Sequence, residues 1–485
     1  MDLIEQIDHW ALAAPNAIAH ISGDQRLTYG ELRRRSDALA AHLTKRFGDN
    51  RTPIAVLGHR EPEMLIAFLG AIKSGRPYVP LDTVLPQQRI DKILAISRPA
   101  LLLTPEDVTR LSSSEASAPA IPTKRDDPFY ILFTSGSTGE PKGVIITLGC
   151  LEHFVAWMLE EQKFLLFSET FLNTAPFSFD LSVMDLYCSL ATGGTLFSIG
   201  RDLVANPKML YRALGNSGAT TWVSTPSFAQ MCLVEEKFAE GMLPSIRRFL
   251  FCGETLAAQT AARLLEHFPR AQVWNMYGPT EATVATTSLR IDLSILEKYS
   301  ALPVGRGMPG TDVLVVNEAG ETLPANEQGE IVIAGPNVSP GYLGRPELTA
   351  AAFFKHCDRR AYRTGDRGRF RDGLLFFEGR MDSQLKLSGY RIEVGDVEAN
   401  LLALSSVRDA VVTPVIKNGS AQSLAAFVVL SSRIEASHFE LTQSLRQQLA
   451  ERLPVYMLPR KFVFLDAFPL TANGKADRAR LAQSL

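Results

Sequence analysis

Apolar residues recur at helical spacing near the start of the chain. Thr28 and Glu31 form the S/T-x-x-E pattern of a capping box, in which each side chain satisfies a backbone N–H at a helix start. Leu32, Leu39 and Leu43 then follow at the spacing of one helix face. The pattern predicts a helix that begins directly after Thr28.

The next stretch alternates short apolar runs with longer helical ones. The runs IAVLG (54–58) and ALLLT (100–104) read as strands, and EMLIAFLGAIKSG (63–75) reads as a helix. Such alternation is typical of an α/β lobe with a largely parallel, buried sheet. Residues 112–124 are small, polar and proline-containing, which predicts a surface connector.

After the connector the alternation resumes, and we interpret it as a second α/β lobe. Its predicted strands are 129–133, 143–147, 194–199, 220–224, 248–253 and 272–278. From about residue 305, short strands with Gly and Pro turns (311–324 and 329–335) predict a small β-rich lobe. The last hundred or so residues predict a compact α+β unit, with helices at 394–404 and 438–453 and strands at 409–416 and 423–431.

Composition excludes several classes of protein. With 485 residues, 46% hydrophobic and 21% charged, the chain is neither disordered nor fibrous. A net charge of -2 supplies no basic field for nucleic acid. No apolar run is long enough for a membrane helix, and the acidic, polar start predicts a cytoplasmic protein with no membrane insertion. The five cysteines have no CxxC spacing, so neither a disulfide framework nor a zinc site is expected.

The run FTSGSTGEPKG (133–143) is the richest chemical signal in the chain. Its glycines and hydroxyl residues make a loop rich in backbone and hydroxyl donors, which suits polyphosphate. It is not a Walker A loop, because Lys142 stands between Pro141 and Gly143 and not in a Gly-Lys-Ser/Thr sequence. The alternative for the run taken alone is a mobile Ser/Gly hairpin.

Three further runs carry candidate nucleotide ligands. In NMYGPTEATV (275–284) a base could stack on Tyr277, and Glu281 could hold Mg²⁺, which prefers carboxylate oxygen. YRTGD ends in Asp366 and FFEGR ends in Arg380, and a carboxylate and a guanidinium at strand ends can bind ribose hydroxyls. The alternatives are that Tyr277 lies at the edge of the core, that Glu281 is a solvated turn acid, and that Asp366 or Arg380 forms a surface ion pair.

These runs, with GRMDSQLKLSGYRIEVGDVE and PLTANGKADR, occur in the order seen in the adenylate-forming superfamily, which the chain resembles over essentially its whole length. The resemblance implies an α/β fold. The large N-terminal domain, residues 1–381, would hold two α/β subdomains and a small β-rich one. A small mobile α+β domain, residues 382–485, would rotate about a hinge at Asp382. ATP and a carboxylic acid would give an acyl-AMP and pyrophosphate, and a phosphopantetheine thiol would then take the acyl group.

The resemblance also implies residue roles. The phosphate loop would comprise Thr134, Ser135, Gly136, Ser137, Thr138, Gly139 and Lys142. Gly253 and Glu254 would flank the adenine, which the segment Asn275, Met276, Tyr277, Gly278, Pro279 and Thr280 would wrap together with the α-phosphate. Asp366 and the run Phe377, Glu378, Gly379 and Arg380 would contact the ribose, and Glu281 would bind Mg²⁺. The catalytic residue would be Lys475, bridging the substrate carboxylate and the α-phosphate; without the family it would read as a surface turn lysine.

Asp180 marks the substrate class within the superfamily. An aspartate at this place of the FSFDLS run is typical of members whose substrate carries an α-ammonium, because a buried carboxylate needs a partner. The alternative is an N-cap at a helix start. The side-chain pocket implied by the resemblance is Leu181, Met184, Ser224, Leu250, Cys252, Met276, Val284 and Ala285, closed by Lys475. Several of these are bulky, so a small apolar substrate is expected.

The runs at 173–187, 223–233, 249–256 and 275–285 are most similar to members that load D-alanine on a carrier protein for teichoic acid D-alanylation. In those members a cysteine at the place of Cys252 helps to set the preferred hand. A monomer with D-alanine and a phosphopantetheine carrier as partners is expected. The alternatives are a free-standing peptide-synthetase-type enzyme for another small amino acid, and a nucleotide-binding regulatory protein without turnover.

Overall fold

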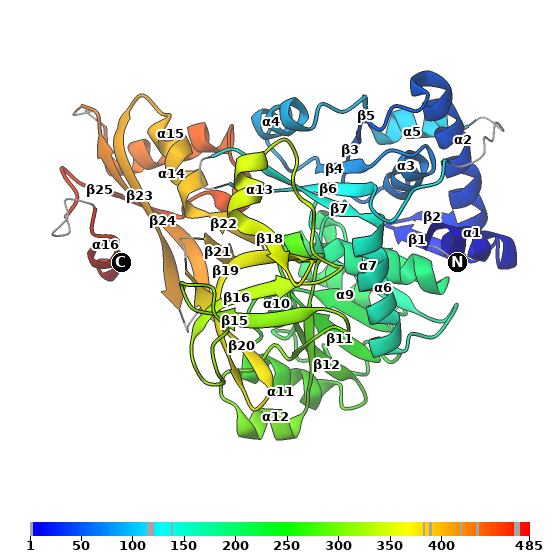
Figure 1. Ribbon diagram of the computed structural model, residues 1–485. Coiled ribbons are helices and arrows are strands. Elements are labelled where there is room, and N and C mark those ends of the chain that lie inside the picture. The colour runs from blue at the N-terminus through cyan, green and yellow to red at the C-terminus, as the bar shows by residue number, and fades with distance from the viewer. Residues whose placement is uncertain are drawn as a thin grey trace. The chain divides into compact units, whose positions relative to one another are not determined.

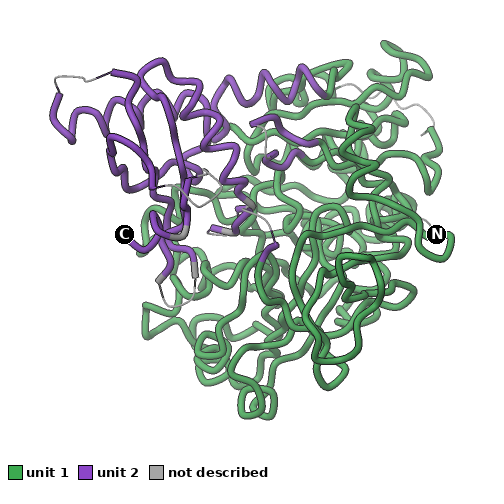
Figure 2. The backbone as a smooth tube through the Cα atoms, turned by 60° about the vertical axis from the view of Figure 1, so that its left-hand side comes forward, with its two compact units in different colours: residues 1–83, 97–132, 143–379 green, residues 84–96, 133–142, 380–485 purple. Residues whose placement is uncertain are grey.

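The computed structural model describes residues 3–113, 121–136, 139–381, 384–387, 390–417, 420–432, 436–469 and 476–485. The chain forms two compact units (Figure 2). Unit 1 is Met1–Thr83, Ser97–Leu132 and Gly143–Gly379, and unit 2 is Val84–Ile96, Phe133–Lys142 and Arg380–Leu485. The domain boundary at residues 381 and 382 stays a prediction, because the hinge residue Asp382 lies outside the described residues.

One sheet has six strands in the order β17-β7-β6-β4-β3-β5. Its members are β3 (Ile54–Gly58), β4 (Tyr78–Asp82), β5 (Leu101–Leu103), β6 (Pro128–Thr134), β7 (Lys142–Thr147) and β17 (Gly341–Tyr342). The strands β5, β3, β4 and β6 are parallel. All residues of α3 (Pro62–Lys73) except Glu63 are buried, in keeping with its largely apolar sequence. The predicted α/β alternation is therefore confirmed.

The capping box at the start of α2 (Tyr29–Phe47) is also confirmed. The Thr28 side chain accepts from the Glu31 backbone N–H, and the Glu31 carboxylate accepts from the Thr28 backbone N–H at 2.9 Å. The helix therefore begins where the sequence predicts.

The second sheet has nine strands in the order β14-β13-β12-β11-β10-β8-β9-β1-β2. They are β1 (Ile18–Ser22), β2 (Gln25–Thr28), β8 (Thr170–Asn173), β9 (Thr195–Ser198), β10 (Thr221–Ser224), β11 (Arg248–Phe251), β12 (Gln272–Tyr277), β13 (Thr287–Ile291) and β14 (Arg306–Gly307). Figure 1 labels β1, β2, β11 and β12 of this sheet. From β1 to β12 the strands are parallel. Their carboxyl ends share one edge, which is where α/β sheets bind ligands.

The two α/β lobes do not follow one another along the chain as the alternation suggested. Strand β6 pairs in the first sheet, with Tyr130 opposite Tyr78, and β1 pairs in the second, with His20 opposite Leu196. The interpretation of 129–147 as the start of the second lobe is therefore wrong. Periodicity identifies a strand, but pairing depends on contacts between distant segments, which periodicity does not carry.

The β-rich lobe is confirmed as an antiparallel sheet in the order β15-β16-β19-β18, with β20 beside β19. It consists of β15 (Asp312–Val316), β16 (Gly329–Ala334), β18 (Phe353–His356), β19 (Arg359–Arg371) and β20 (Leu374–Arg380). The other helices outside the C-terminal segment are α1 (Leu3–Ala13), α4 (Gln87–Ser97), α5 (Pro105–Leu111), α6 (Leu148–Gln162), α7 (Leu181–Thr192), α8 (Arg201–Ala205), α9 (Pro207–Asn216), α10 (Pro226–Cys232), α11 (Ala258–His267), η1 (Thr280–Ala282), α12 (Leu293–Lys298) and α13 (Pro346–Ala352).

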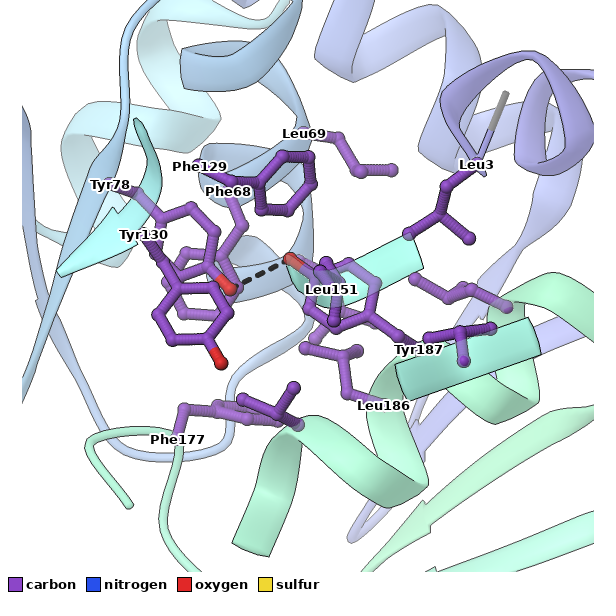
Figure 3. Close-up of a cluster of buried hydrophobic side chains, with 14 of the residues drawn as sticks. Leu3, Phe68, Leu69, Tyr78, Phe129, Tyr130, Leu151, Phe177, Leu186 and Tyr187 are labelled. Atoms are coloured by element: carbon purple, nitrogen blue, oxygen red, sulfur yellow. Dashed lines mark hydrogen bonds between the residues drawn. The ribbon is translucent and has the colours of Figure 1, made fainter. Parts of the chain in front are cut away.

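An aromatic core joins elements of both sheets in unit 1 (Figure 3). Phe68 stacks on Tyr78 at a centroid distance of 4.2 Å, and the Tyr78 and Tyr187 hydroxyls share a hydrogen bond of 2.7 Å. Phe177 packs edge-on against Phe68 at 5.7 Å. Buried aromatic pairs add specific geometry to apolar burial. This core therefore anchors the segment that leads to Asp180.

The C-terminal segment has its own core and confirms the predicted α+β pattern. It comprises β21 (Gln384–Leu387), β22 (Tyr390–Glu393), α14 (Val394–Leu402), β23 (Val407–Lys417), β24 (Ser420–Leu430), α15 (His438–Ala450), η2 (Val455–Met457), β25 (Lys461–Phe464) and α16 (Arg478–Gln483). Over the described part of the chain, no helix combines the length and apolar character that a bilayer span requires.

Candidate active site

Asp180 stands immediately before α7, but it does not cap that helix. Its backbone is helical (φ -61°, ψ -31°), and its side chain accepts no capping hydrogen bond. The Thr280 hydroxyl instead donates to Asp180 Oδ2 at 2.5 Å. The alternative role as an N-cap is therefore wrong, and the carboxylate is held toward the turn that follows β12.

A buried polar network fixes the backbone that leads to Asp180. The Asn173 amide donates to both Asp185 oxygens at 3.2 Å, and Ser198 Oγ donates to Asn173 Oδ1 at 2.9 Å. The guanidinium of Arg60 donates to the carbonyl oxygens of residues 173 and 174. His20 Nε2 lies 2.9 Å from Ser198 Oγ. These residues tie β1, β8, β9 and α7 together.

Burial sets the protonation states in this network. It raises the pKa of Asp185 well above its usual value, against the opposing effect of the Asn173 hydrogen bonds. Burial, aided by the positive charge of Arg60, lowers the pKa of His20 to about 3. His20 is therefore neutral at neutral pH. Sequence patterns gave no sign of this network.

The apolar positions expected to line the amino-acid pocket do come together. All belong to one buried core, and none is more than 5% exposed; we call them the amino-acid cluster: Leu181, Met184, Leu250, Cys252, Met276, Val284 and Ala285. Ser224 is buried, but its hydroxyl accepts from the Trp222 indole N–H at 2.7 Å and donates to the Thr225 carbonyl at 2.8 Å. It therefore shapes the strand end.

Glu281 is the acidic residue of the turn after β12, and it is fully buried. The Tyr342 hydroxyl donates to Glu281 Oε1 at 2.8 Å, and the Ser339 backbone N–H donates to the Glu281 carbonyl at 2.9 Å. A buried carboxylate with an oriented oxygen fits one carboxylate ligand of Mg²⁺, which usually takes its other ligands from phosphates and water. The described residues contain no group of three or more metal-ligating side chains, so Mg²⁺ would depend on the nucleotide.

The predicted adenine and ribose residues of unit 1 also form contacts. The Tyr277 hydroxyl donates to Asp366 Oδ2 at 2.6 Å, and its ring lies 5.8 Å from that of Phe377. Glu254 Oε2 accepts from the Ser227 backbone N–H at 3.1 Å. Tyr277 thus joins the turn after β12 to the β-rich lobe.

Two other predicted ligands have side chains that bind protein groups. The Asn275 amide donates to the Pro303 carbonyl at 2.9 Å. The Glu378 carboxylate accepts from Gln328 at 2.6 Å and pairs with Arg369 at 2.6 Å. Their roles toward a nucleotide stay predictions, as do those of the backbone positions Met276, Gly278 and Pro279.

The phosphate loop and Arg380 belong to unit 2. There Lys142 Nζ lies 3.4 Å from Glu393 Oε1, and Ser135 Oγ accepts from the Glu393 backbone N–H at 3.1 Å. Gly139 has a φ of 80°, a conformation that favours glycine. Ser137, Thr138 and Lys475 lie outside the described residues.

Tyr130 is a candidate that the sequence did not single out. Its hydroxyl is buried, and within the described ranges no hydrogen-bond partner is present for it. Burial raises the pKa of Tyr130 well above its usual value, with further contributions from Tyr78 and the charge of Asp180. Figure 3 shows this hydroxyl directed away from the Tyr78–Tyr187 pair. A buried hydroxyl near a carboxylate is a ready contact for a small polar ligand.

Family comparisons agree with this site. A family model described as AMP-binding enzyme matches residues 7–343, and one described as AMP-binding enzyme C-terminal domain matches residues 396–475. The chain therefore belongs to the AMP-binding enzyme family, which confirms the resemblance. Its relatives include proteins named "D-alanine--D-alanyl carrier protein ligase" from Bacillus cereus (strain Q1) and Bacillus mycoides (strain KBAB4). Each is 46% identical over 499 residues, covering 99% of both chains.

Solved structures confirm the fold class. The Vibrio cholerae adenylation domain AlmE, in complex with glycyl-adenosine-5'-phosphate, has a TM-score of 0.87 at 22% identity, covering 99% of this chain and 97% of that one. Holo-PA1221, a protein containing adenylation and PCP domains, has a TM-score of 0.85 at 26% identity, covering 100% of this chain and 84% of that one. The α/β architecture is thus that of adenylation proteins.

Proposed function

We propose that this enzyme activates D-alanine with ATP and transfers it to the phosphopantetheine thiol of a carrier protein. The observation that carries the proposal is the pairing of Asp180 with the amino-acid cluster: a carboxylate that does not cap its helix stands at the start of α7, which also carries Leu181 and Met184 of that cluster. Full-length relatives at 46% identity named as D-alanine ligases support the same substrate and partner. D-alanylation of teichoic acid would follow from this activity.

In the first step, a carboxylate oxygen of D-alanine attacks the α-phosphorus of ATP, and the bond to the bridging oxygen of pyrophosphate breaks. The products are D-alanyl-AMP and pyrophosphate. Nucleotidyl transfer needs positioning and charge neutralisation more than covalent help from the protein. Asp180 binds the α-ammonium, and Lys475 places its charge between the carboxylate and the α-phosphate. A flexible stem with a point charge suits that bridging role.

Several side chains hold the nucleotide. Tyr277 and Asp366 hold the adenine and ribose end, and Ser135 and Lys142 of the phosphate loop bind the β- and γ-phosphates. Glu281 would be the protein ligand of Mg²⁺, which neutralises phosphate charge when it is bound. Tyr342 orients that carboxylate through its hydrogen bond of 2.8 Å.

In the second step, the carrier thiol loses its proton and attacks the acyl carbon, and the bond to the phosphate oxygen of AMP breaks. The products are a thioester and AMP. The C-terminal domain, residues 382–485, would rotate about Asp382 between the two steps. We propose that the enzyme acts as a cytoplasmic monomer that meets its carrier in solution.

The amino-acid cluster accounts for the preferred size of substrate. Met184, Met276 and Val284 are at most 2% exposed, so a longer side chain would have to displace packed atoms. A single methyl group is worth only about 1–3 kcal/mol in discrimination, so glycine and serine are expected as weak substrates. The Cys252 thiol donates to the Val284 carbonyl at 3.6 Å, which fixes the side chain that helps to select the hand.

The test is amino-acid-dependent exchange of labelled pyrophosphate into ATP, with D-alanine, L-alanine, glycine and D-serine. We expect D-alanine to give the highest kcat/KM, and loading of a purified phosphopantetheinylated carrier to depend on it. A higher value for another small amino acid would favour a peptide-synthetase-type enzyme. No exchange with any carboxylic acid in a broad panel would favour a nucleotide-binding protein without turnover.

A further inference from the structure

Asn337, in the segment between β16 and β17, is fully buried, and its amide nitrogen and backbone carbonyl both bind one turn. Its amide nitrogen donates to the Ala282 carbonyl at 3.0 Å and to Thr286 Oγ1 at 3.2 Å. Its side-chain oxygen accepts from Thr311 Oγ1 at 2.8 Å, and its backbone carbonyl accepts from Thr283 Oγ1 at 2.7 Å. Asn337 therefore bonds to the turn 282–286 on both sides of Val284.

That turn has a backbone conformation that its residues disfavour. Thr283 has a φ of 59° and Val284 a φ of 68°, although both are β-branched. The Ala285 backbone N–H donates to the Thr283 carbonyl at 2.8 Å, which closes a three-residue turn around Val284. A γ-turn with a positive central φ is rare and strained. Such a turn persists only where its surroundings hold it.

The strained turn aims two groups at the amino-acid cluster. It buries the Val284 side chain to 2% exposure, and it turns the Val284 carbonyl to accept from the Cys252 thiol. A valine that relaxed to a negative φ would move its side chain and its carbonyl together. The substrate-facing surface would then lose its shape, even though Asn337 itself belongs to a different strand connection.

Gly335 leaves the space that this arrangement needs. A Cβ atom at Gly335 would lie 2.5 Å from Thr311 Oγ1 and 2.9 Å from Asn337 Oδ1. Both distances are too short, so a side chain there would separate the hydroxyl of Thr311 from the amide of Asn337. Gly335 thus offers a second way to perturb Asn337 without changing it.

We propose that Asn337 is a positioning residue for substrate selection: it holds Val284 in the left-handed turn and thereby sets the size and the hand of the accepted amino acid. This inference rests on the proposed function.

The test measures pyrophosphate exchange in Asn337→Ala, Asn337→Asp and Gly335→Ala, with D-alanine, L-alanine and D-2-aminobutyrate. Asn337→Asp keeps the oxygen that accepts from Thr311 but loses both donors. We expect the KM for D-alanine to rise about tenfold and the preference over D-2-aminobutyrate to fall about tenfold, while the KM for ATP changes less than about twofold. The matched control is Asn317→Ala, whose amide bonds Glu321 within a surface hairpin; it should leave every value unchanged.

A Val284→Gly background separates positioning from general structural damage. Glycine adopts a positive φ without strain, so Asn337→Ala should change selectivity much less there than in the valine background. An equal change in both backgrounds, or unchanged selectivity in folded Asn337→Asp, would overturn the inference. If wild-type enzyme prefers another amino acid to D-alanine, the proposed function fails, and the same variants are compared with that amino acid and its next larger homologue.

Discussion

Replacing Asp180 by asparagine tests the amino-acid site most directly. The change keeps the shape of the side chain and an oxygen that can accept from Thr280, but it removes the negative charge. Truncating one partner of a buried charge pair costs about 2–5 kcal/mol. Asp180 is only partly buried, so we take about 3 kcal/mol, which is about a 150-fold loss in kcat/KM for D-alanine.

Pyrophosphate exchange is measured first with D-alanine varied at saturating ATP and then with ATP varied. The two series separate the effect on D-alanine from the effect on ATP. The loss should fall on the amino acid, with the KM for ATP nearly unchanged. Because Asp180 makes no capping bond, thermal stability should also stay close to that of the wild type.

Asp292 provides the matched control, since it truly caps α12 by accepting from the Ile295 backbone N–H at 3.0 Å. Asp292→Ala should lower the free energy of unfolding by about 1 kcal/mol and leave the KM for D-alanine unchanged. Our reasoning would be refuted if Asp180→Asn lowered kcat/KM for D-alanine less than about threefold. It would also be refuted if the variant lowered kcat/KM for ATP as much as kcat/KM for D-alanine.

Three further predictions use other parts of the molecule. Tyr277→Phe removes the donor to Asp366, so we expect the KM for ATP to rise about fivefold to tenfold and the KM for D-alanine to stay constant. A raised KM for D-alanine with an unchanged KM for ATP would place Tyr277 and Asp366 outside the nucleotide site. His20 stays neutral in the folded state down to about pH 3, whereas the unfolded state takes up a proton below about pH 6.5. Lowering the pH should therefore lower the free energy of unfolding, by about 2 kcal/mol near pH 5 from this group. Urea unfolding of His20→Gln should lack that part of the pH dependence, and an equal pH dependence in variant and wild type would contradict the prediction. Lys475→Ala should lower adenylation by orders of magnitude and spare thiolation of preformed D-alanyl-AMP, whereas equal loss of both steps would contradict the proposed domain rotation.

Local chemistry predicted much of the fold. The capping box of Thr28 and Glu31 predicted the start of α2, and the helical run at 63–75 predicted α3. The partnership of strands was not predictable in the same way. Strand β6 pairs with β4, about fifty residues earlier in the chain, and no local pattern encodes such a pairing.

The same division applies to the candidate site. Motifs identified Asp180, Tyr277, Glu281 and Asp366, which the structure shows to be hydrogen bonded. The residues that orient them were missed. Asn337 bonds to a carbonyl 55 residues away in sequence, and a buried amide in a Gly-Pro-Asn loop looks like an ordinary turn residue until its partners are known.

The exchange of strands between the two sheets has a consequence for how the chain is made. β1 emerges from the ribosome early, but its parallel partner β9 follows about 175 residues later. At ordinary synthesis rates β1 waits about 10–35 seconds for that partner. Neither sheet can be completed from one half of the chain, so cutting the gene within the connector at 112–124 should give two fragments that need each other to fold. The His20–Ser198 contact across this pairing, which belongs to the network before Asp180, therefore forms only after β9 has been made.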